Sequence, residues 1–332
     1  YSGKRYYNGC KYMDEIEDLA TEAVTSLYEC KFANVQPHSG VNANTAVYQA
    51  LMKPGDVIMG MDLASGGHLS HGAPPTLSGK VYNSVTYGVD EDGLLNYEEI
   101  RALAKVSKPN VIVAGASAYP RQIDWKAFKD IADGVGAFLV ADMAHYSGLV
   151  AGKVYDSPLP YADVVTSTTH KTLRGPRGGM ILWNNPNYSK KINSSIFPGT
   201  QGGPLMNIIA AKAQCYLEAL EDSFKVYSKN VIDNAKAMAQ TFEENGLPVL
   251  TGGTDSHIIL IDLSKSKISG REAADKLEEN GITVNKNGVP NDPRNFIETS
   301  GIRIGTAAET TKGHDKKWFT NLAKRIIIIL NG

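Results

Sequence analysis

Cysteine is scarce in this sequence. Its 332 residues include only Cys10, Cys30 and Cys215, which are far apart and form no CxxC spacing. An odd number of widely spaced cysteines favours neither a disulfide framework nor a zinc site built on thiolates. We therefore expect a reducing, cytoplasmic compartment and no bound metal ion.

The sequence also lacks long hydrophobic runs and an excess of either charge. Its longest apolar run, Ile326 to Leu330, is far shorter than the roughly 18 residues that a membrane-spanning helix requires. A net charge of -1 gives no basic surface for nucleic acid or an anionic membrane. We expect no membrane and no nucleic-acid partner, so any anionic ligand must be bound by local groups.

The first two thirds of the sequence contain short apolar runs that alternate with helical patterns. Such an alternation predicts an α/β protein with a mostly parallel sheet between helices. The expected helices include 97–106 and 125–132, and a flexible loop is expected over 64–72. The expected strands are 57–61, 81–87, 111–114, 138–141, 164–168 and 180–183.

The last third has a different pattern. Long helical stretches cover 203–220 and 222–245, and Gly and Pro residues then interrupt the chain. The segments beyond them predict a smaller α+β unit, with strands over 257–263, 282–284 and 302–304 and helices over 271–280 and at the end of the chain. We expect a large domain of residues 1–221 and a small C-terminal domain of residues 222–332, with the boundary within 222–250.

Residues 163–179 read DVVTSTTHKTLRGPRGG, an apolar run that passes through hydroxyl residues to His170 and Lys171. Lysine is rarely buried, because removing an ammonium from water is costly. If Lys171 lies at the inner end of a core strand, burial lowers its pKa and makes the neutral amine a nucleophile toward a carbonyl carbon. The alternative, in which the lysine leaves the sheet for solvent, stays open on this stretch alone.

Two further segments carry polar groups at the ends of apolar patterns. Ser39 and Gly40 precede a helix expected to begin near Asn42, where free backbone N–H groups bind anions; plain capping of the helix by Ser39 is the alternative. Asp142 and His145 end the strand FLVADMAH, at the carboxyl edge where sites of α/β sheets gather. A buried aspartate needs a cationic partner, such as a protonated cofactor ring nitrogen, unless it only caps a loop.

Arg303 stands between apolar residues in SGIRIGT, where a guanidinium suits bidentate capture of a carboxylate. An exposed strand edge or an internal ion pair is the alternative. His68 and His71 are spaced like metal ligands, but no carboxylate or cysteine stands near them to complete a set. Taken together, Lys171, Asp142, the Ser39–Gly40 turn and Arg303 are the groups that a pyridoxal phosphate enzyme acting on an amino acid requires.

The sequence resembles the serine hydroxymethyltransferase (glycine hydroxymethyltransferase) family over essentially its whole length. The resemblance rests on the segments GKRYYNGC, NVQPHSG, GGHLSHG, ADMAH, TTHKTLRGPRGG, FPGTQGGP, GGTDSH, VNKN, VPNDP and SGIRIGT. It implies the pyridoxal-phosphate-dependent transferase fold, which is aspartate-aminotransferase-like. It also implies reversible transfer of a hydroxymethyl unit between serine and tetrahydrofolate, giving glycine and methylene-tetrahydrofolate, by a homodimer or higher assembly with its site at the subunit interface.

The resemblance also implies roles for individual residues. Pyridoxal 5'-phosphate would be covalently held by Lys171, and tetrahydrofolate would be the co-substrate. The implied catalytic residues are Lys171, Asp142, His68, His170, Thr168 and Tyr7. The implied cofactor-binding residues add Ser39 and Gly40 at the phosphate, Ser117 and His145 at the ring oxygen, and Gly203 from the other subunit. The implied substrate-binding residues are Arg303 for the carboxylate, Tyr7, and Tyr6, Leu63, Gly67, Leu69 and Asn287 in a folate pocket, while Arg177 is expected to be structural.

The sequence departs from the family at several places. Ser167 replaces a threonine, Tyr146 and Ser147 replace small or apolar residues, and 294–298 differs beside the expected folate pocket. We also expect that the family's N-terminal arm and extreme C-terminus are missing from this sequence. The alternatives are a threonine aldolase-like lyase or a cysteine desulfurase of the same fold, or a truncated, non-catalytic paralogue; a desulfurase would need a cysteine in a mobile loop, whereas Cys215 lies in a helical pattern.

Overall fold

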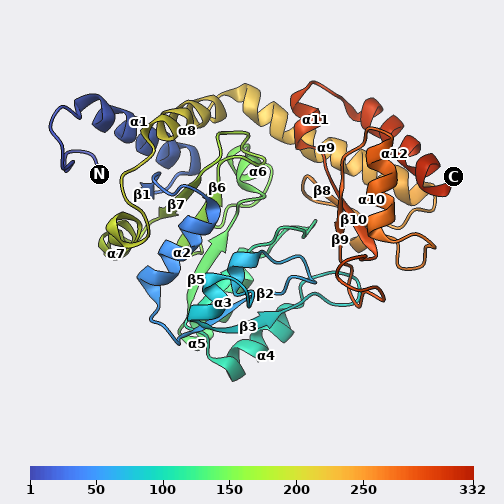
Figure 1. Cartoon of the computed structure of the whole chain (residues 1–332), viewed down its shortest axis with the longest axis horizontal. Coiled ribbons are helices and arrows are strands. Elements are labelled where there is room, and N and C mark those ends of the chain that lie inside the picture. The colour runs from blue at the N-terminus through green and yellow to red at the C-terminus, as the bar shows by residue number, and fades with distance from the viewer.

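The computed structural model describes all 332 residues, which form two β-sheets flanked by helices. The N- and C-termini lie at opposite ends of an elongated molecule (Figure 1). None of the helices combines the length and the apolar character needed to cross a membrane.

The larger sheet has seven strands in the order β1-β7-β6-β5-β4-β2-β3. Only β7 runs antiparallel to its neighbours, so the expectation of a mostly parallel sheet is confirmed. The strands are β1 (Phe32–Asn34), β2 (Val57–Met61), β3 (Asn83–Tyr87), β4 (Val111–Ala114), β5 (Phe138–Asp142), β6 (Val164–Thr168) and β7 (Gly179–Trp183).

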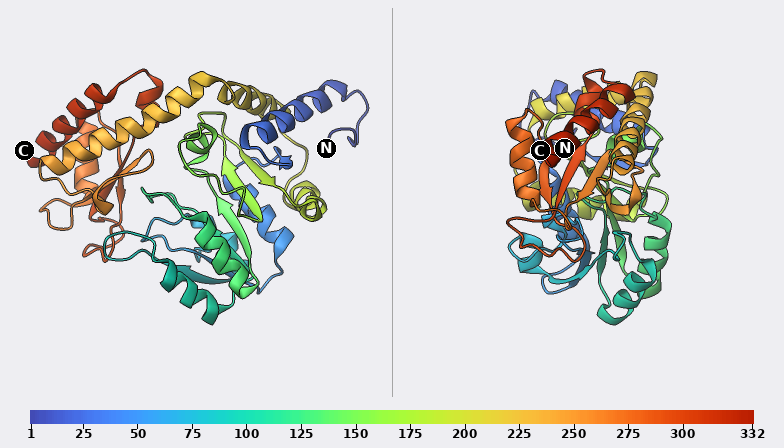
Figure 2. Two further views of the ribbon diagram at one scale, coloured as in Figure 1. Left: turned by 180° about the vertical axis from the view of Figure 1, so that it is seen from behind. Right: turned by 90° about the vertical axis from the view of Figure 1, so that its right-hand side faces the viewer.

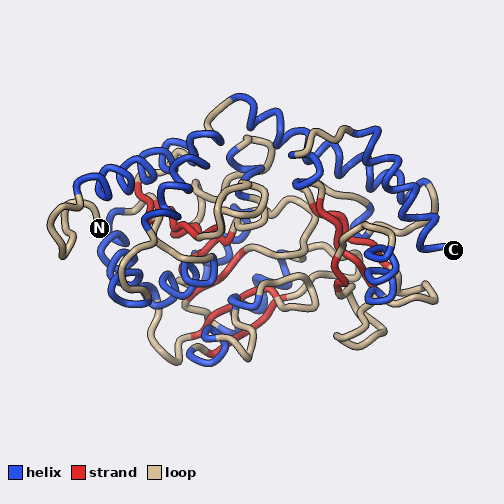
Figure 3. Tube along the Cα trace, turned by 45° about the horizontal axis from the view of Figure 1, so that its top comes forward, coloured by secondary structure: helices blue, strands red, loops and turns tan.

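Both faces of this sheet are covered by helices, as Figure 3 shows. The apolar side chains of β4 alternate, with Val111 and Val113 packed in one core cluster and Ile112 and Ala114 in another. A strand that is buried on both faces reads as a continuous apolar run, which explains why these strands could be recognised in the sequence. One face packs against α2 (Gly40–Leu51) and α7 (Ser189–Ser194). The other packs against α1 (Lys11–Tyr28), α4 (Tyr97–Ser107), α5 (Trp125–Val135), α6 (Ser147–Ala151) and α8 (Met206–Ala219).

The smaller unit contains an antiparallel sheet in the order β8 (Ile258–Asp262), β10 (Gly301–Gly305), β9 (Asn285–Asn287). The expected strand over 282–284 is wrong. Ile282 contributes a buried side chain to the core, but the backbone pairs with β10 only from Asn285, which lies opposite Arg303. The helices of this unit are α10 (Gly270–Glu279), α11 (Ala307–Thr311) and α12 (Lys316–Asn331).

Helix α9 (Asp222–Glu244) connects the two sheets and packs in the core of each (Figure 2). Its first half buries Phe224 and Val231 beside the larger sheet, and its second half buries Met238 and Phe242 beside the smaller one. The expected division after residue 221 falls between α8 and α9 and stays a prediction.

The segment after β2 differs from the flexible loop expected there. A 3-10 turn at Leu69–His71 and a short helix α3 (Leu77–Val81) order it, and His71 is buried. This turn lies beside the carboxyl ends of the central strands. Buried polar groups there need hydrogen-bond partners, and Ser70 and His71 of the turn provide them.

Candidate active site

A cavity of about 290 Å³ lies at the carboxyl ends of β4, β5 and β6. Because β5 and β6 are parallel neighbours, with Asp142 opposite Thr166, the residues that follow them meet at one edge of the sheet. The expected residues that line this cavity are Ser39, Gly40, His68, Ser117, Asp142, His145, Thr168, His170 and Lys171.

Lys171 follows β6 and lines the cavity half-buried, with no carboxylate paired to its ammonium. Burial lowers its pKa, although the nearby charge of Asp142 opposes the shift; the positive charges of Arg303 and Arg177 lower it further. The expectation of a nucleophilic amine at the inner end of a core strand therefore has a physical basis in the structure.

Asp142 ends β5 and is almost completely buried. One carboxylate oxygen accepts hydrogen bonds from Nε2 of His71 at 2.8 Å and from the amide of Asn44 at 2.9 Å. The other accepts from the backbone N–H of Ala144 at 3.0 Å. Burial alone would raise the pKa of Asp142, but the hydrogen bonds from His71 and Asn44 and the charge of Lys171 hold it below its ordinary value. Asp142 is therefore a carboxylate anion.

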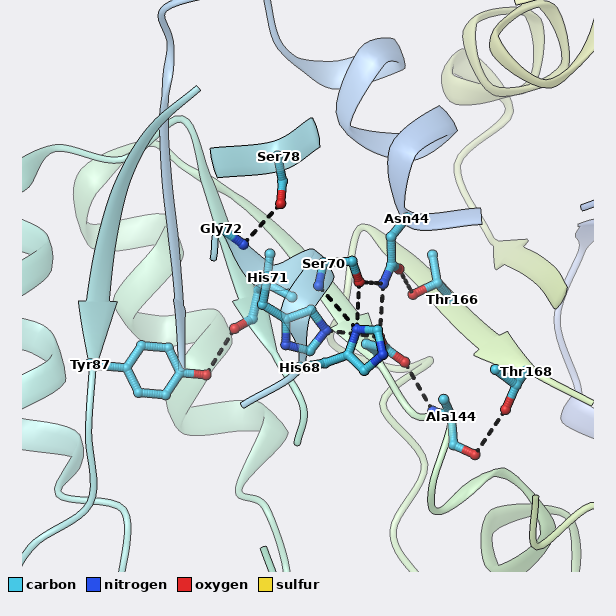
Figure 4. A network of polar contacts seen from close by, with 12 residues as sticks. Asn44, His68, Ser70, His71, Gly72, Ser78, Tyr87, Ala144, Thr166 and Thr168 are labelled. Carbon is cyan, nitrogen blue, oxygen red and sulfur yellow. Dashed lines mark hydrogen bonds and ion pairs between the residues drawn. The ribbon is translucent and has the colours of Figure 1, made fainter. Parts of the chain in front are cut away.

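Asn44 connects three elements around this carboxylate (Figure 4). Its amide nitrogen donates to Ser70 and Asp142, each at 2.9 Å, and its oxygen accepts from the hydroxyl of Thr166 at 2.6 Å. Asn44 was not predicted as a site residue. Its position one helical turn after Gly40, on the same face of α2, is the signal that could have identified it.

His68 and His71 lie side by side in the same network (Figure 4), with ring centroids 5.5 Å apart. Nδ1 of His68 accepts from the backbone N–H of Ser70 at 3.1 Å, so the hydrogen of the neutral ring is on Nε2. Burial lowers the pKa of His68, although Asp142 opposes the shift. His68 therefore lines the cavity with its ring held by Ser70, while His71 serves as the hydrogen-bond donor to Asp142.

Ser39 is the N-cap of α2, and its hydroxyl oxygen accepts from the backbone N–H of Asn42 at 3.2 Å. The capping alternative is therefore real, yet Ser39 and Gly40 also line the cavity, where the first amides of α2 have no partner within the helix. A Cβ atom at Gly40 would lie 2.7 Å from Cγ2 of Thr168. The α2 backbone at Gly40 therefore lies closer to the side chain of Thr168 than a residue with a Cβ atom allows.

His145 faces the cavity and meets His257, a histidine that sequence reasoning did not select. Nδ1 of His145 lies 3.5 Å from Nε2 of His257, while the ring centroids are 5.6 Å apart and the planes are within 16°. The rings therefore meet edge to edge. Burial lowers the pKa of His145, and the charge of Lys171 lowers it further; burial lowers the pKa of His257 to about 3. Both imidazoles are thus held neutral.

Arg303 lies on β10 and reaches across to the larger sheet. Its guanidinium donates to Oδ1 of Asn285 at 2.9 Å and to the backbone oxygen of Ser117. It forms no ion pair with a carboxylate, so the internal ion pair considered for it is absent and its charge faces the cavity region beside His145.

The other expected residues lie outside this cavity. Tyr6 and Tyr7 are exposed, at 95% and 76%, and Gly203 lies on the surface with no neighbour within 4 Å of a Cβ position. Leu63 lines a second cavity of about 880 Å³ that also includes Pro290, whereas Gly67, Leu69 and Asn287 do not line it.

Two basic residues near the cavity were not assigned to the site. Arg177 lines the cavity, and its expected structural role stays a prediction. Lys212 is buried behind the Ser39–Gly40 turn. Its spacing from Ile209, Ala213 and Tyr216 places it in the buried stripe of α8, and a lysine in an apolar stripe is the signal that could have identified it. No group of three or more His, Cys, Asp or Glu side chains in the chain is arranged to hold a metal ion.

The α/β fold and a cavity with a lysine, a buried aspartate and a helix N-terminus define a pyridoxal-phosphate-dependent transferase of the aspartate-aminotransferase-like fold. The family model described as serine hydroxymethyltransferase matches residues 1–326, and the chain belongs to this family.

Curated relatives carry the same name. The serine hydroxymethyltransferase of Rhodospirillum centenum is 55% identical over all of this chain, which covers 78% of that protein's length. Serine hydroxymethyltransferase 2 of Rhodospirillum rubrum is 56% identical, with 77% of its length covered. The serine hydroxymethyltransferase of Chromohalobacter salexigens is 56% identical, with 79% of its length covered.

Family membership confirms the expected activity: a glycine hydroxymethyltransferase that transfers a one-carbon unit reversibly between serine and tetrahydrofolate and uses pyridoxal phosphate. Its substrates are serine, glycine and tetrahydrofolate. The threonine aldolase-like lyase and the inactive paralogue are not favoured.

Proposed function

We propose that the cavity at the carboxyl ends of β5 and β6 is where this chain binds pyridoxal phosphate and carries out hydroxymethyl transfer. The observation that carries the proposal is the meeting of Lys171, Asp142 and the Ser39–Gly40 turn in the wall of one cavity. An amine nucleophile, a buried carboxylate and an anion-binding helix N-terminus match the carbonyl, the ring nitrogen and the phosphate of that cofactor.

The residues present fit the cofactor at each of these groups. A Cβ at Gly40 would lie 2.7 Å from Cγ2 of Thr168, which lines the same cavity, and Nδ1 of His170 is a buried nitrogen without a partner in the chain. When bound, pyridoxal phosphate supplies an electron-poor ring that takes up the electron pair released at the α-carbon of the amino acid. We assign its phosphate to Ser39 and Gly40, with Gly203 of a second subunit as a further contact.

Lys171 and Asp142 have complementary tasks in this proposal. Lys171 would hold the cofactor covalently through its side-chain amine, because its lowered pKa makes the neutral amine available as a nucleophile. Asp142 remains a carboxylate and holds a proton on the ring nitrogen, while its hydrogen bonds to His71 and Asn44 fix its orientation.

The remaining cavity residues position the ring. His68 would lie against one face of the ring, and the bond from the Ser70 amide fixes the orientation of its imidazole. We assign His145 and Ser117 to the ring oxygen and Thr168 and His170 to positions beside Lys171, since all four line the cavity.

We assign the amino acid carboxylate to Arg303, the guanidinium without a carboxylate partner beside His145. Tyr7 completes this substrate site. The folate pocket is assigned to Tyr6, Leu63, Gly67, Leu69 and Asn287, and the cavity of about 880 Å³ next to Leu63 is large enough for an extended ligand.

We further propose a homodimer or larger assembly with the site at the subunit interface. Tyr6, Tyr7 and Gly203 are exposed and lie away from the chain's own cavity, as residues that serve a second subunit would. The cytoplasmic location also stays a proposal, supported by three free cysteines.

The test of this proposal is the variant Lys171→Gln, with the exposed lysine variant Lys190→Gln as the matched control. We expect Lys171→Gln to abolish repeated turnover of serine with tetrahydrofolate and the exchange of the glycine α-proton, while some cofactor binding remains. Retained multiple turnover in Lys171→Gln would contradict the assigned role. Parallel assays with threonine measure whether the protein also cleaves threonine, as the less favoured threonine aldolase-like lyase would.

A further inference from the structure

Lys212 on α8 is a buried lysine for which the proposed mechanism has no task. Its side chain is only 1% exposed, and Nζ donates to the backbone oxygens of Val35 at 2.7 Å, Pro37 at 3.0 Å and Gly179 at 2.8 Å. An ammonium has three N–H donors and needs three acceptors, whereas a neutral amine would turn its lone pair toward one of these oxygens. The arrangement therefore fits a charged lysine.

No carboxylate offsets this charge. Lys212 has no ion pair with any Asp or Glu of the chain, and burial lowers its pKa to about 7. A buried cation without a counter-charge is costly, so its presence needs a compensating interaction.

The three acceptors place Lys212 directly behind the turn assigned to the phosphate. Val35 and Pro37 belong to the segment that leads into Ser39, and the N–H of Gly179 donates to the oxygen of Pro37 at 3.0 Å. A Cβ at Gly179 would lie 2.3 Å from the backbone oxygen of Ser39, so the start of β7 touches the turn itself. The ammonium and the cavity thus lie on opposite sides of one thin layer of backbone.

We propose that Lys212 is a positioning residue for the cofactor phosphate. Its buried ammonium orders the Val35–Gly40 segment, and the negative charge of the phosphate dianion offsets the positive charge of this ammonium. The inference rests on the assignment of Ser39 and Gly40 to the phosphate. Lys212 does not touch the ligand; it acts through the backbone dipoles that it holds and through its charge in a region of low dielectric.

The surrounding charges agree with a dianionic ligand. His38 lies next to Ser39, and its pKa is lowered by burial and by the charge of Lys212. Lys171 and Arg177 add positive charge on the cavity side. On the far side of the segment, Glu17 is already paired with Arg5 and bonded to Gln36, so it does not neutralise Lys212.

Gln201 offers a neutral comparison within the same segment. Its side chain accepts from the N–H of His38 and donates to the oxygen of Gln36, each at 2.9 Å. It orders the segment by hydrogen bonds as Lys212 does, but it carries no charge. Loss of Gln201 should therefore weaken the binding of any ligand next to this segment. Loss of Lys212 should weaken most the binding of a ligand with a phosphate.

The experiment compares binding of pyridoxal phosphate and of pyridoxal to full-length apoprotein carrying Lys212→Met, Gln201→Leu or Ser39→Ala. We expect Lys212→Met to weaken pyridoxal phosphate about tenfold or more relative to pyridoxal, and Lys212→Arg to retain most of the preference. Gln201→Leu should weaken both ligands alike. Equal weakening of both ligands in Lys212→Met would overturn the proposal, because Lys212 would then be a structural residue only.

Two controls separate this inference from the assignment beneath it. If Ser39→Ala loses the preference for the phosphate and Lys212→Met keeps it, the role of Lys212 is wrong and the phosphate site stands. If neither variant changes the preference, both fall. On the unaltered apoprotein, nitrogen NMR of the lysine side chains should show the pKa of Lys212 rising when inorganic phosphate binds; an unchanged pKa would contradict the proposal even where Lys212→Met does not fold.

Discussion

Nε2 of His71 lies 2.8 Å from Oδ2 of Asp142, within the wall of the cavity assigned to the cofactor. The histidine comes from the turn after β2 and the aspartate from the end of β5, so the bond joins segments 71 residues apart. It makes the carboxylate that we assign to the cofactor's ring nitrogen a fixed, ionised group.

Removal of this bond should affect the chemistry more than the fold. In His71→Ala, Asp142 loses a hydrogen bond that stabilises its charged form, so its pKa should rise. We expect kcat to fall about 10- to 100-fold in His71→Ala, which is the loss expected when one hydrogen bond to a charged group is removed. Steady-state kinetics measure this loss, and His71→Gln, which keeps a donor, should recover part of it; kcat equal in His71→Ala and the unaltered enzyme would contradict the role.

The sequence allowed much of this edge of the sheet to be predicted. The apolar runs that form β4, β5 and β6 are buried on both faces. Asp142 ends β5 and Lys171 follows β6, and these two strands are parallel neighbours, as expected. Because such strands are set by continuous local hydrophobicity, their places can be read from a short window of residues.

The partners of these residues could not be predicted in the same way. The contacts of Asn44 and His71 with Asp142 span 98 and 71 residues, and no local pattern encodes them. The strand β9 was missed because Asn285 pairs through its backbone while the apolar side chains lie just before it. Tertiary contacts of this kind outweigh local propensity.

Arg303 provides a test of substrate binding that is separate from the cofactor. Arg303→Ala removes a guanidinium without leaving a carboxylate unpaired, so the fold should tolerate it. We expect the KM for serine and the dissociation constant of glycine to rise about 10- to 100-fold, from the loss of a charge-assisted contact. Arg303→Lys should recover charge but not the two-pronged geometry. An unchanged affinity for glycine would show that another group binds the carboxylate.

Gly40 and Thr168 form a pair that can be tested by substitution of both. Alanine at position 40 would place Cβ 2.7 Å from Cγ2 of Thr168. We expect Gly40→Ala to lower the free energy of unfolding by about 1 to 3 kcal/mol, as overpacking does. Thr168→Ser removes that methyl group, so the double variant should regain most of the loss in urea titrations. Strictly additive effects would mean that the two residues do not meet in solution.

His257 should make stability depend on pH. Its folded pKa of about 3 lies below the ordinary value of 6.5, so between these values the unfolded chain binds a proton that the folded chain does not. Stability from this group is therefore complete above pH 6.5 and is lost as the pH falls toward 3, at about 1.4 kcal/mol per pH unit. The free energy of unfolding, measured by urea titrations at several pH values in this range, should fall more steeply with decreasing pH in the unaltered chain than in His257→Gln. An equal dependence on pH in the two proteins would contradict the buried neutral state.

The position of the covalent bond to the cofactor tests the proposed site most directly. Borohydride reduction of the holoenzyme, digestion and peptide mass spectrometry identify the lysine that carries the pyridoxyl group. The chain offers two buried or half-buried lysines with lowered pKa values, Lys171 in the cavity and Lys212 behind it. We expect the label on Lys171 alone, and a label on Lys212 or on any other lysine would contradict the proposed site.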